Sequence, residues 1–175
     1  MIVKLYQCGD NQIFINNLDI CSINTDSLRK KVLYLSQNTF FLKGTIKENL
    51  CLGKEFSAED IDEACRLACM DNTIKNLPYQ YNYTLSEDAS NLSIGQKQRL
   101  SIARALLHKP DVIIFDEITS NIDKGNTDKI MENLKSYNGI KLFITHKIED
   151  LDYFDKVYTI KQKTIHLQER RAMMS

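Results

Sequence analysis

Apolar residues recur along the chain with two different periods, and each period predicts a different kind of element. Between residues 100 and 107 they recur every three or four positions, which is the spacing of one helix face, with Lys97, Arg99 and Arg104 off that face. Residues 112–115 are instead four consecutive apolar side chains, mostly β-branched, which is typical of a strand buried on both faces of a parallel sheet. The pattern therefore predicts an α/β chain.

Shorter apolar runs predict the other strands. They are residues 12–16, 32–35, 140–144, 156–160 and 164–167. The last two are expected to form a closing hairpin. Residues 1–7 predict the tail of a helix, and residues 169–175 a frayed tail.

The interval from residue 39 to residue 109 is expected to be mostly helical. Ser57 and Asp71 each stand where a helix cap is needed, as do Asp26 before this interval and either Asp123 or Asn126 after it. Tyrosines at 79, 81 and 83 alternate, which favours a half-buried extended segment over an aromatic binding face.

The stretch Asn91–Leu107 opens with the spacing of a capping box, since Ser93 precedes Gln96 by three residues. The first turn of such a helix carries free N–H groups at the positive end of the helix dipole, and this is a site for an anion. Gly95 allows a ligand to approach the backbone closely. These residues alone fit an ordinary capped helix equally well.

Two carboxylates, Asp116 and Glu117, follow the buried strand. They could be solvated groups that cap the next turn, but Gln37 and His146 also follow predicted strands. In a parallel sheet all four side chains would meet at the carboxyl edge, where ligands bind. There Asp116 would hold Mg²⁺, Glu117 would orient a water molecule and His146 would donate to a phosphate, an arrangement that suits phosphoryl transfer.

The composition narrows the class of protein. The 175 residues carry 23 basic and 23 acidic side chains, so nothing indicates a general nucleic-acid binder. No apolar run is long enough to span a membrane, and the apolar run at the N-terminus is too short for a signal peptide. Five scattered cysteines indicate reduced thiols, and Cys65 and Cys69 are expected to be small core residues rather than metal ligands.

Five segments resemble the motifs of ATP-binding cassette (ABC) proteins, in the order and at the spacing of that family. Residues 91–99, Asn-Leu-Ser-Ile-Gly-Gln-Lys-Gln-Arg, resemble the signature motif, and Val112–Glu117 resembles the Walker B strand with its catalytic glutamate. Three shorter segments are similar to the Q-loop, the D-loop and the switch histidine, namely Tyr34–Gln37, Ser120–Asp123 and Ile144–His146.

The resemblance implies a partial RecA-like P-loop NTPase core with an inserted helical subdomain that carries the signature. The core would comprise about residues 1–38 and 110–168, the helical subdomain about 39–109, and residues 169–175 a tail. The segments 40–50 and 86–91 resemble exporters within the family. Residues 26–31 are similar to peptide or bacteriocin exporters.

The resemblance also implies cofactors, partners and residue roles. ATP and Mg²⁺ would be the cofactors. A second nucleotide-binding domain, in a head-to-tail dimer, and an ABC transmembrane domain at the cytoplasmic face of the membrane would be the partners, with no nucleic acid. The implied residues are Glu117, His146 and Gln37 for catalysis, Asp116 and Gln37 for Mg²⁺, and Ser93, Gly95, Gln96 and Asp123 for ATP.

The sequence departs from the family pattern at three places. The phosphate-binding motif Gly-x-x-x-x-Gly-Lys-Ser/Thr is absent, which predicts a domain truncated at its N-terminus, without its first strand and this loop. Ile94 replaces the first glycine of the signature pair, and Ala89 replaces a glycine in the segment before it.

The departures leave three hypotheses open. The first is the truncated ATP-binding domain of an exporter, with doubtful hydrolysis of its own. The second is a non-catalytic remnant or split-gene half that offers its signature motif to a partner. The third is a soluble ABC ATPase, although no coiled coil or basic arm is visible in the sequence.

Overall fold

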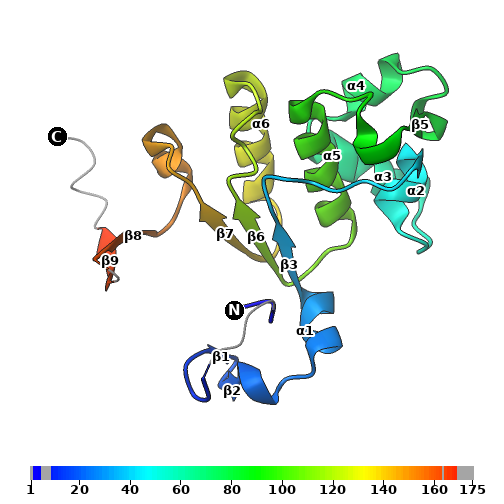
Figure 1. The fold of residues 1–175 in the computed structure, drawn as a ribbon. Helices are drawn as coiled ribbons and strands as arrows, with labels where there is room; N and C mark the ends of the chain where they lie inside the picture. The colour runs from blue at the N-terminus through cyan, green and yellow to red at the C-terminus, as the bar shows by residue number, and fades with distance from the viewer. Residues whose placement is uncertain (1, 5–8, 163, 169–175) are drawn as a thin grey trace. The chain divides into compact units, whose positions relative to one another are not determined.

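The computed structural model describes residues 2–4, 9–162 and 164–168 (Figure 1). The chain divides into two compact units, Met1–Ile144 and Thr145–Ser175. The first unit contains a parallel three-stranded sheet with the order β3-β6-β7, formed by Val32–Leu35, Val112–Asp116 and Ile140–Ile144. The structure confirms both the predicted strands and their parallel arrangement.

The two faces of the sheet meet different parts of the unit. Ile113 and Phe115 of β6 belong to the larger core, together with apolar side chains of α5 (Ile94–Leu107) and α6 (Lys124–Lys135). Ile114, which points to the opposite face, packs with Val32 and the N-terminal residues in a smaller core. Strand β6 is therefore buried on both faces, as its unbroken apolar run predicts.

The N-terminal part is a short hairpin followed by a helix. Strands β1 (Phe14–Ile15) and β2 (Leu18–Asp19) pair antiparallel across Asn16 and Asn17, which both have positive φ, as a two-residue hairpin turn requires. The predicted cap of the next helix is wrong, because Asn24 rather than Asp26 caps α1 (Thr25–Lys31). Residues 2–4 form a turn and a bend instead of a helix, and residues 1 and 5–7 of that prediction lie outside the described residues.

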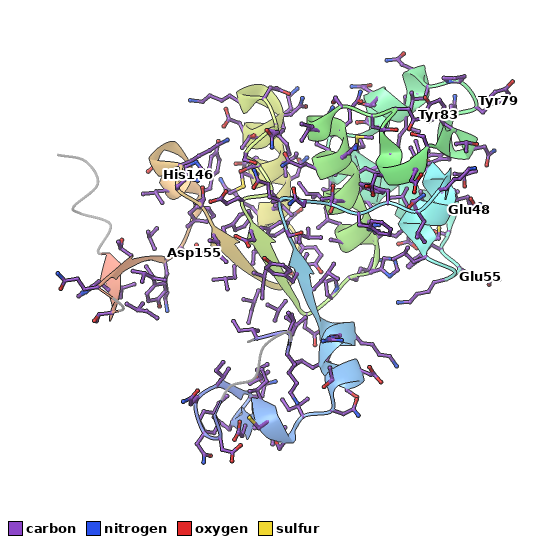
Figure 2. The ribbon with its side chains drawn as sticks, in the orientation of Figure 1. Glu48, Glu55, Tyr79, Tyr83, His146 and Asp155 are labelled. Carbon is purple, nitrogen blue, oxygen red and sulfur yellow. The ribbon has the colours of Figure 1, made fainter. Side chains whose placement is uncertain are left out.

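The middle of the unit carries short helices, as expected for residues 39–109. They are α2 (Ile46–Cys51), α3 (Ala58–Leu67), α4 (Asp71–Asn76), η2 (Gln80–Asn82) and η3 (Glu87–Ala89), with the two-stranded pair β4 (Gly44–Thr45) and β5 (Thr84–Leu85). Ser57 caps α3 as predicted. A capping box formed by Thr45 and Glu48 begins α2, and Figure 2 labels Glu48 in it.

Two predictions in this interval are wrong. Asp71 is the first residue of α4 rather than its cap, and the N-cap position belongs to Met70. The tyrosine segment is not extended, because residues 80–82 form a 3₁₀ turn that begins at a left-handed Tyr79. Tyr79 is fully solvated at 84% exposure, whereas the Tyr83 hydroxyl accepts a hydrogen bond from Asn91 (Figure 2).

Helix α5 contributes many residues to the core of the unit, with eight of its fourteen residues buried. Arg104, predicted to lie off the apolar face, is half-buried, because its guanidinium stacks over Phe41 at 4.7 Å and donates to the carbonyl of Phe40. Asp123, one of the two predicted candidates, caps α6 by accepting from the backbone N–H of Asn126.

The second unit contains η4 (Ile148–Tyr153), β8 (Val157–Lys161) and β9 (Thr164–Gln168), and the first unit also contains the 3₁₀ turn η1 (Ile20–Ser22). Strands β8 and β9 pair antiparallel, which confirms the predicted hairpin. Among the described residues, no helix combines the length and the apolar content needed to cross a bilayer.

Candidate functional site

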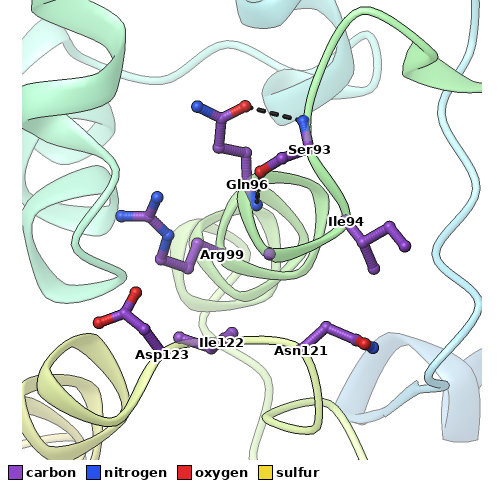
Figure 3. Close-up of a pocket in the computed structure, with 8 residues that line it drawn as sticks. Ser93, Ile94, Gln96, Arg99, Asn121, Ile122 and Asp123 are labelled. Atoms are coloured by element: carbon purple, nitrogen blue, oxygen red, sulfur yellow. Dashed lines mark hydrogen bonds between the residues drawn. The ribbon is translucent and has the colours of Figure 1, made fainter.

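A cavity of about 430 Å³ lies at the N-terminus of α5 and is called the α5 cavity below (Figure 3). One wall is the first turn of α5, and the other is the loop Thr119–Asp123 that leads into α6. Its lining residues are Ser93, Ile94, Gly95, Gln96, Arg99, Asn121, Ile122 and Asp123. The structure therefore places all four residues predicted to face ATP around a single cavity.

The first turn of α5 has the predicted capping box. The Gln96 N–H donates to Ser93 Oγ at 3.2 Å, and the Ser93 N–H donates to Gln96 Oε1 at 2.8 Å (Figure 3). Within the part of the chain that the structure describes, the backbone N–H groups of Ile94 and Gly95 have no acceptor. Two donors at the positive end of a fourteen-residue helix therefore border the cavity, as anion binding requires.

Gly95 also has a packing role. A Cβ placed on Gly95 would lie 2.6 Å from the backbone oxygen of Asn121, which is closer than any carbon can approach. The helix and the loop can therefore touch only because residue 95 lacks a side chain. Contact with the loop explains this glycine as well as contact with a phosphate does.

A buried amide joins the helix to the loop. Gln98 is 1% exposed, its Oε1 accepts from the Asn121 N–H at 3.1 Å, and its Nε2 donates to Ser120 Oγ at 3.3 Å. Ser120 Oγ also accepts from Nε2 of Gln37 at 3.2 Å and from Nδ2 of Asn121 at 3.0 Å. One hydroxyl therefore connects three of the segments that sequence analysis treats separately.

The charged residues of the cavity are held by local bonds. Arg99 donates to the carbonyl of Cys69 and to Thr73 Oγ1, and so turns its guanidinium toward the helices of the middle interval. The side chain and the N–H of Asn126 donate to Asp123 and lower the pKa of that carboxyl. Asp123 is therefore ionised at neutral pH and acts first as the cap of α6.

The paired carboxylates end β6 as predicted. Asp116 accepts a hydrogen bond from the hydroxyl of Tyr34 on the neighbouring strand β3. Glu117 has a positive φ of 52°, and its N–H donates to the carbonyl of Ile144 at 3.0 Å. A non-glycine residue in this region costs about 1–3 kcal/mol, but Glu117 shares a positive φ with twelve other described non-glycine residues, so the backbone angle alone does not mark it as functional.

Two of the other predicted residues lie on different units. Gln37 follows β3, whose parallel pairing with β6 places Gln37 and Asp116 at the same edge of the sheet. His146 is exposed and belongs to the second unit (Figure 2), so its approach to the carboxylates stays a prediction.

Sequence reasoning missed Gln98 and Tyr34. Gln98, Ser101 and Ala105 are all buried and recur at helical spacing, so they form a second, more polar stripe beside the apolar face of α5. That stripe was the available signal for Gln98. For Tyr34 the sequence offered no such signal, because its contact with Asp116 spans 82 positions.

Comparison with known proteins agrees with these motifs. The family model described as ABC transporter matches residues 1–120. The chain is 49% identical over 143 residues to the SPbeta prophage-derived sublancin-168-processing and transport ATP-binding protein of Bacillus subtilis, covering 82% of this chain and 20% of that protein. It is 36% identical over 165 residues to the lactococcin-G-processing and transport ATP-binding protein of Lactococcus lactis, covering 93% and 24%.

A solved structure shows the same fold. A bacterial Atm1-family ABC exporter with ATP bound superposes with a TM-score of 0.86 at 26% identity, covering 93% of this chain and 29% of that one. The chain thus spans less than a third of the length of each of these relatives. Because the family model covers more than half of the chain and the exporter fold matches nearly all of it, the chain belongs to the ABC transporter family and has the fold of an ABC exporter nucleotide-binding domain.

Proposed function

We propose that this chain contributes the signature half of an ATP site to an ABC exporter. In this proposal Ser93, Gly95 and Gln96 bind the γ-phosphate of an ATP molecule whose other phosphates lie in the phosphate loop of a second nucleotide-binding domain. The chain contains no Gly-x-x-x-x-Gly-Lys-Ser/Thr motif, so it is not expected to hold ATP well by itself.

The observation that carries the proposal is the unpaired first turn of α5. The N–H groups of Ile94 and Gly95 border the α5 cavity without an acceptor among the described residues, and the Ser93 hydroxyl stands beside them. Hydrogen bonds to a charged group are worth about 1.5–3 kcal/mol each, so a phosphate oxygen is a fitting acceptor. Ile94 is 61% exposed, so its side chain does not fill the cavity.

The edge of the sheet, whose residues do not line the α5 cavity, would hold a magnesium ion and a water molecule in the second ATP site of such a dimer. Mg²⁺ binds oxygen ligands, and the Asp116 carboxylate offers them at the end of β6. Gln37 donates its Nε2 to Ser120, which leaves the amide oxygen for the ion. Glu117 would orient the attacking water and His146 would donate to the γ-phosphate, and ATP supplies the phosphoanhydride bond that is broken.

The relatives indicate the setting of such a site. The two bacterial relatives are processing and transport proteins for sublancin-168 and lactococcin-G. The proposed partners are accordingly a second nucleotide-binding domain and an ABC transmembrane domain, and the proposed place is the cytoplasmic face of the membrane. The proposed cargo is a peptide of the bacteriocin class.

A comparison of two caps tests the proposal. Ser93 and Thr45 form equivalent capping boxes at α5 and α2, and replacing either with alanine costs about 1 kcal/mol of stability. The chain is mixed with a second ABC nucleotide-binding domain that has a phosphate loop and a Glu→Gln change that blocks hydrolysis. Association is then measured by analytical ultracentrifugation with and without Mg-ATP.

We expect association that depends on ATP, weakened about tenfold or more by Ser93→Ala and unchanged by Thr45→Ala. Equal effects of the two variants would mean that Ser93 acts only as a helix cap. Association without ATP would contradict the proposal. The chain alone should give no ATP turnover that is abolished by Glu117→Gln. Such turnover would show that it holds ATP unaided.

A further inference from the structure

The loop wall of the α5 cavity is held from two directions by α5 itself. The Asn121 N–H bonds to Oε1 of Gln98, while the Asn121 carbonyl lies so close to Gly95 that a Cβ would meet it at 2.6 Å. Asn121 lines the cavity opposite Ser93 (Figure 3). Any shift of the loop therefore changes the width of the cavity at the turn that is proposed to meet phosphate.

Gln98 is the one long polar side chain of α5 that is almost completely buried, at 1% exposure. Burying an amide is favourable only when its hydrogen bonds are made, and Gln98 uses one atom to accept from the loop and the other to donate to it. Its neighbour one turn later, Ser101, is equally buried, yet its hydroxyl is without a partner among the described residues. The two residues share a face of the helix and differ in whether they bind the loop.

The bond to Ser120 extends the connection to the sheet edge. Ser120 Oγ accepts from Gln98 at 3.3 Å and from Gln37 at 3.2 Å. Gln37 thus stands two hydrogen bonds away from α5. A change at Gln98 can reach Gln37 without any direct contact between the two side chains.

We propose that Gln98 is a positioning residue that fixes the Thr119–Asp123 loop against the first turn of α5 and, through Ser120, sets the orientation of the Gln37 amide. The proposal rests on the proposed function only for its consequence in nucleotide binding. The hydrogen-bond connection itself concerns residues of one chain and can be tested without nucleotide.

Amide exchange and side-chain resonances, both measured by NMR, test the connection. Gln98→Met keeps the length of the side chain and removes both hydrogen bonds, and Ser101→Ala is the matched control on the same face. Gln98→Met should speed exchange of the Asn121 amide about tenfold and shift the Nε2 signals of Gln37, while Ser101→Ala leaves both unchanged. Exchange that rises equally along all of α5, or an unchanged Asn121 amide, would overturn the proposal.

A second arm connects the positioning role to the site. In the ATP-dependent association assay, Gln98→Met should bind the partner domain about tenfold more weakly although Ser93 and Gly95 are intact. If the wild-type chain binds and Gln98→Met binds as tightly, Gln98 does not position the site. If the wild-type chain does not bind, the proposed function fails, and the exchange data alone decide the role of Gln98.

A third variant guards against a misfolded Gln98→Met protein. Ser120 is half-buried, so Ser120→Ala is better tolerated, and it removes the hydrogen bonds that end on the Ser120 hydroxyl while it keeps the bond between Gln98 and the Asn121 N–H. It should shift the Gln37 signals and leave exchange of the Asn121 amide slow. Unchanged Gln37 signals in Ser120→Ala would overturn the proposed route to Gln37.

Discussion

Helix α5 begins with the turn that borders the cavity, and strand β7 belongs to the sheet whose edge carries Asp116, yet the two elements are supported very differently. Eight of the fourteen residues of α5 are buried, while in β7 exposed and half-buried positions alternate and none is buried. Phe143 of β7 stacks on Phe115 at 4.4 Å on the helix-covered face of the sheet. On the other face Ile140, Leu142 and Ile144 are 66%, 40% and 48% exposed.

The register explains the difference. Leu142 is paired with Ile114, so both lie on the face that the N-terminal residues cover over β3 and β6. Over β7 the described residues of the first unit provide no such cover, and three apolar side chains meet solvent. Helix α5 thus packs into the larger core, whereas β7, which lies in the same sheet as Asp116, is covered on only one face by the described residues of the first unit.

The largest effect on stability is expected when a leucine is shortened to alanine in α5 and, for comparison, in β7. Leu100 of α5 is fully buried, so Leu100→Ala should lower the free energy of unfolding by about 2–5 kcal/mol. Leu142→Ala should cost less than about 1 kcal/mol, because much of that side chain already contacts water. Urea unfolding followed by circular dichroism measures both, and similar losses would mean that the face of β7 is covered in solution.

A smaller effect is expected from adding a methyl group where helix and loop touch. Gly95→Ala forces the Asn121 carbonyl away and should cost about 1–3 kcal/mol. Gly125→Ala in α6 is the matched control, since its Cβ would lie 3.6 Å from Asp123 Oδ1, an ordinary contact, and should stabilise the helix by about 0.5 kcal/mol. The same unfolding measurement applies, and a neutral Gly95→Ala would show that the loop yields freely.

Sequence reasoning succeeded where the relevant physics is local. The capping box of Ser93 and Gln96 involves residues three apart, and the buried strand at 112–115 is visible in its unbroken apolar run. It failed where neighbours compete for one role: Asn24 and Asp26 are both good caps, and only the chain's path selects Asn24. The Gln98 and Tyr34 contacts span 22 and 82 positions, so periodicity carries no record of their partners.

The α5 cavity shows the same division. Ser93, Gly95 and Gln96 could be assigned from a resemblance in one short segment, and Asp123 from another. That the two segments face each other across one cavity follows from the packing of α5 against the loop, which no single stretch contains. The second role of Gly95, as the contact point with Asn121, is likewise visible only in three dimensions.

The smallest expected effect concerns the far end of α5, where His108 ties the helix to its neighbours. One ring nitrogen of His108 lies 3.0 Å from the Leu50 carbonyl, the other lies 3.3 Å from Lys54 Nζ, and the ring meets Phe56 edge-on. Burial lowers the pKa of His108, and the charges of Lys54 and Arg104 lower it further, against the bond to Leu50. Strand β7 contains no histidine, so this pH sensitivity should belong to the helical side alone.

The direction in which stability changes with pH follows from the lowered pKa of His108. The unfolded chain binds a proton on His108 near pH 6.5, before the folded chain does, so the stabilising contribution is present above that pH and is lost as the pH falls toward the folded value. His108→Gln keeps a donor for the Leu50 carbonyl and cannot titrate. Its free energy of unfolding should therefore fall less steeply between pH 7 and pH 5 than that of the wild type, measured by urea unfolding at each pH. Every other titrating group is shared by the two proteins, so parallel curves would mean that His108 is equally easy to protonate in the folded and unfolded chains.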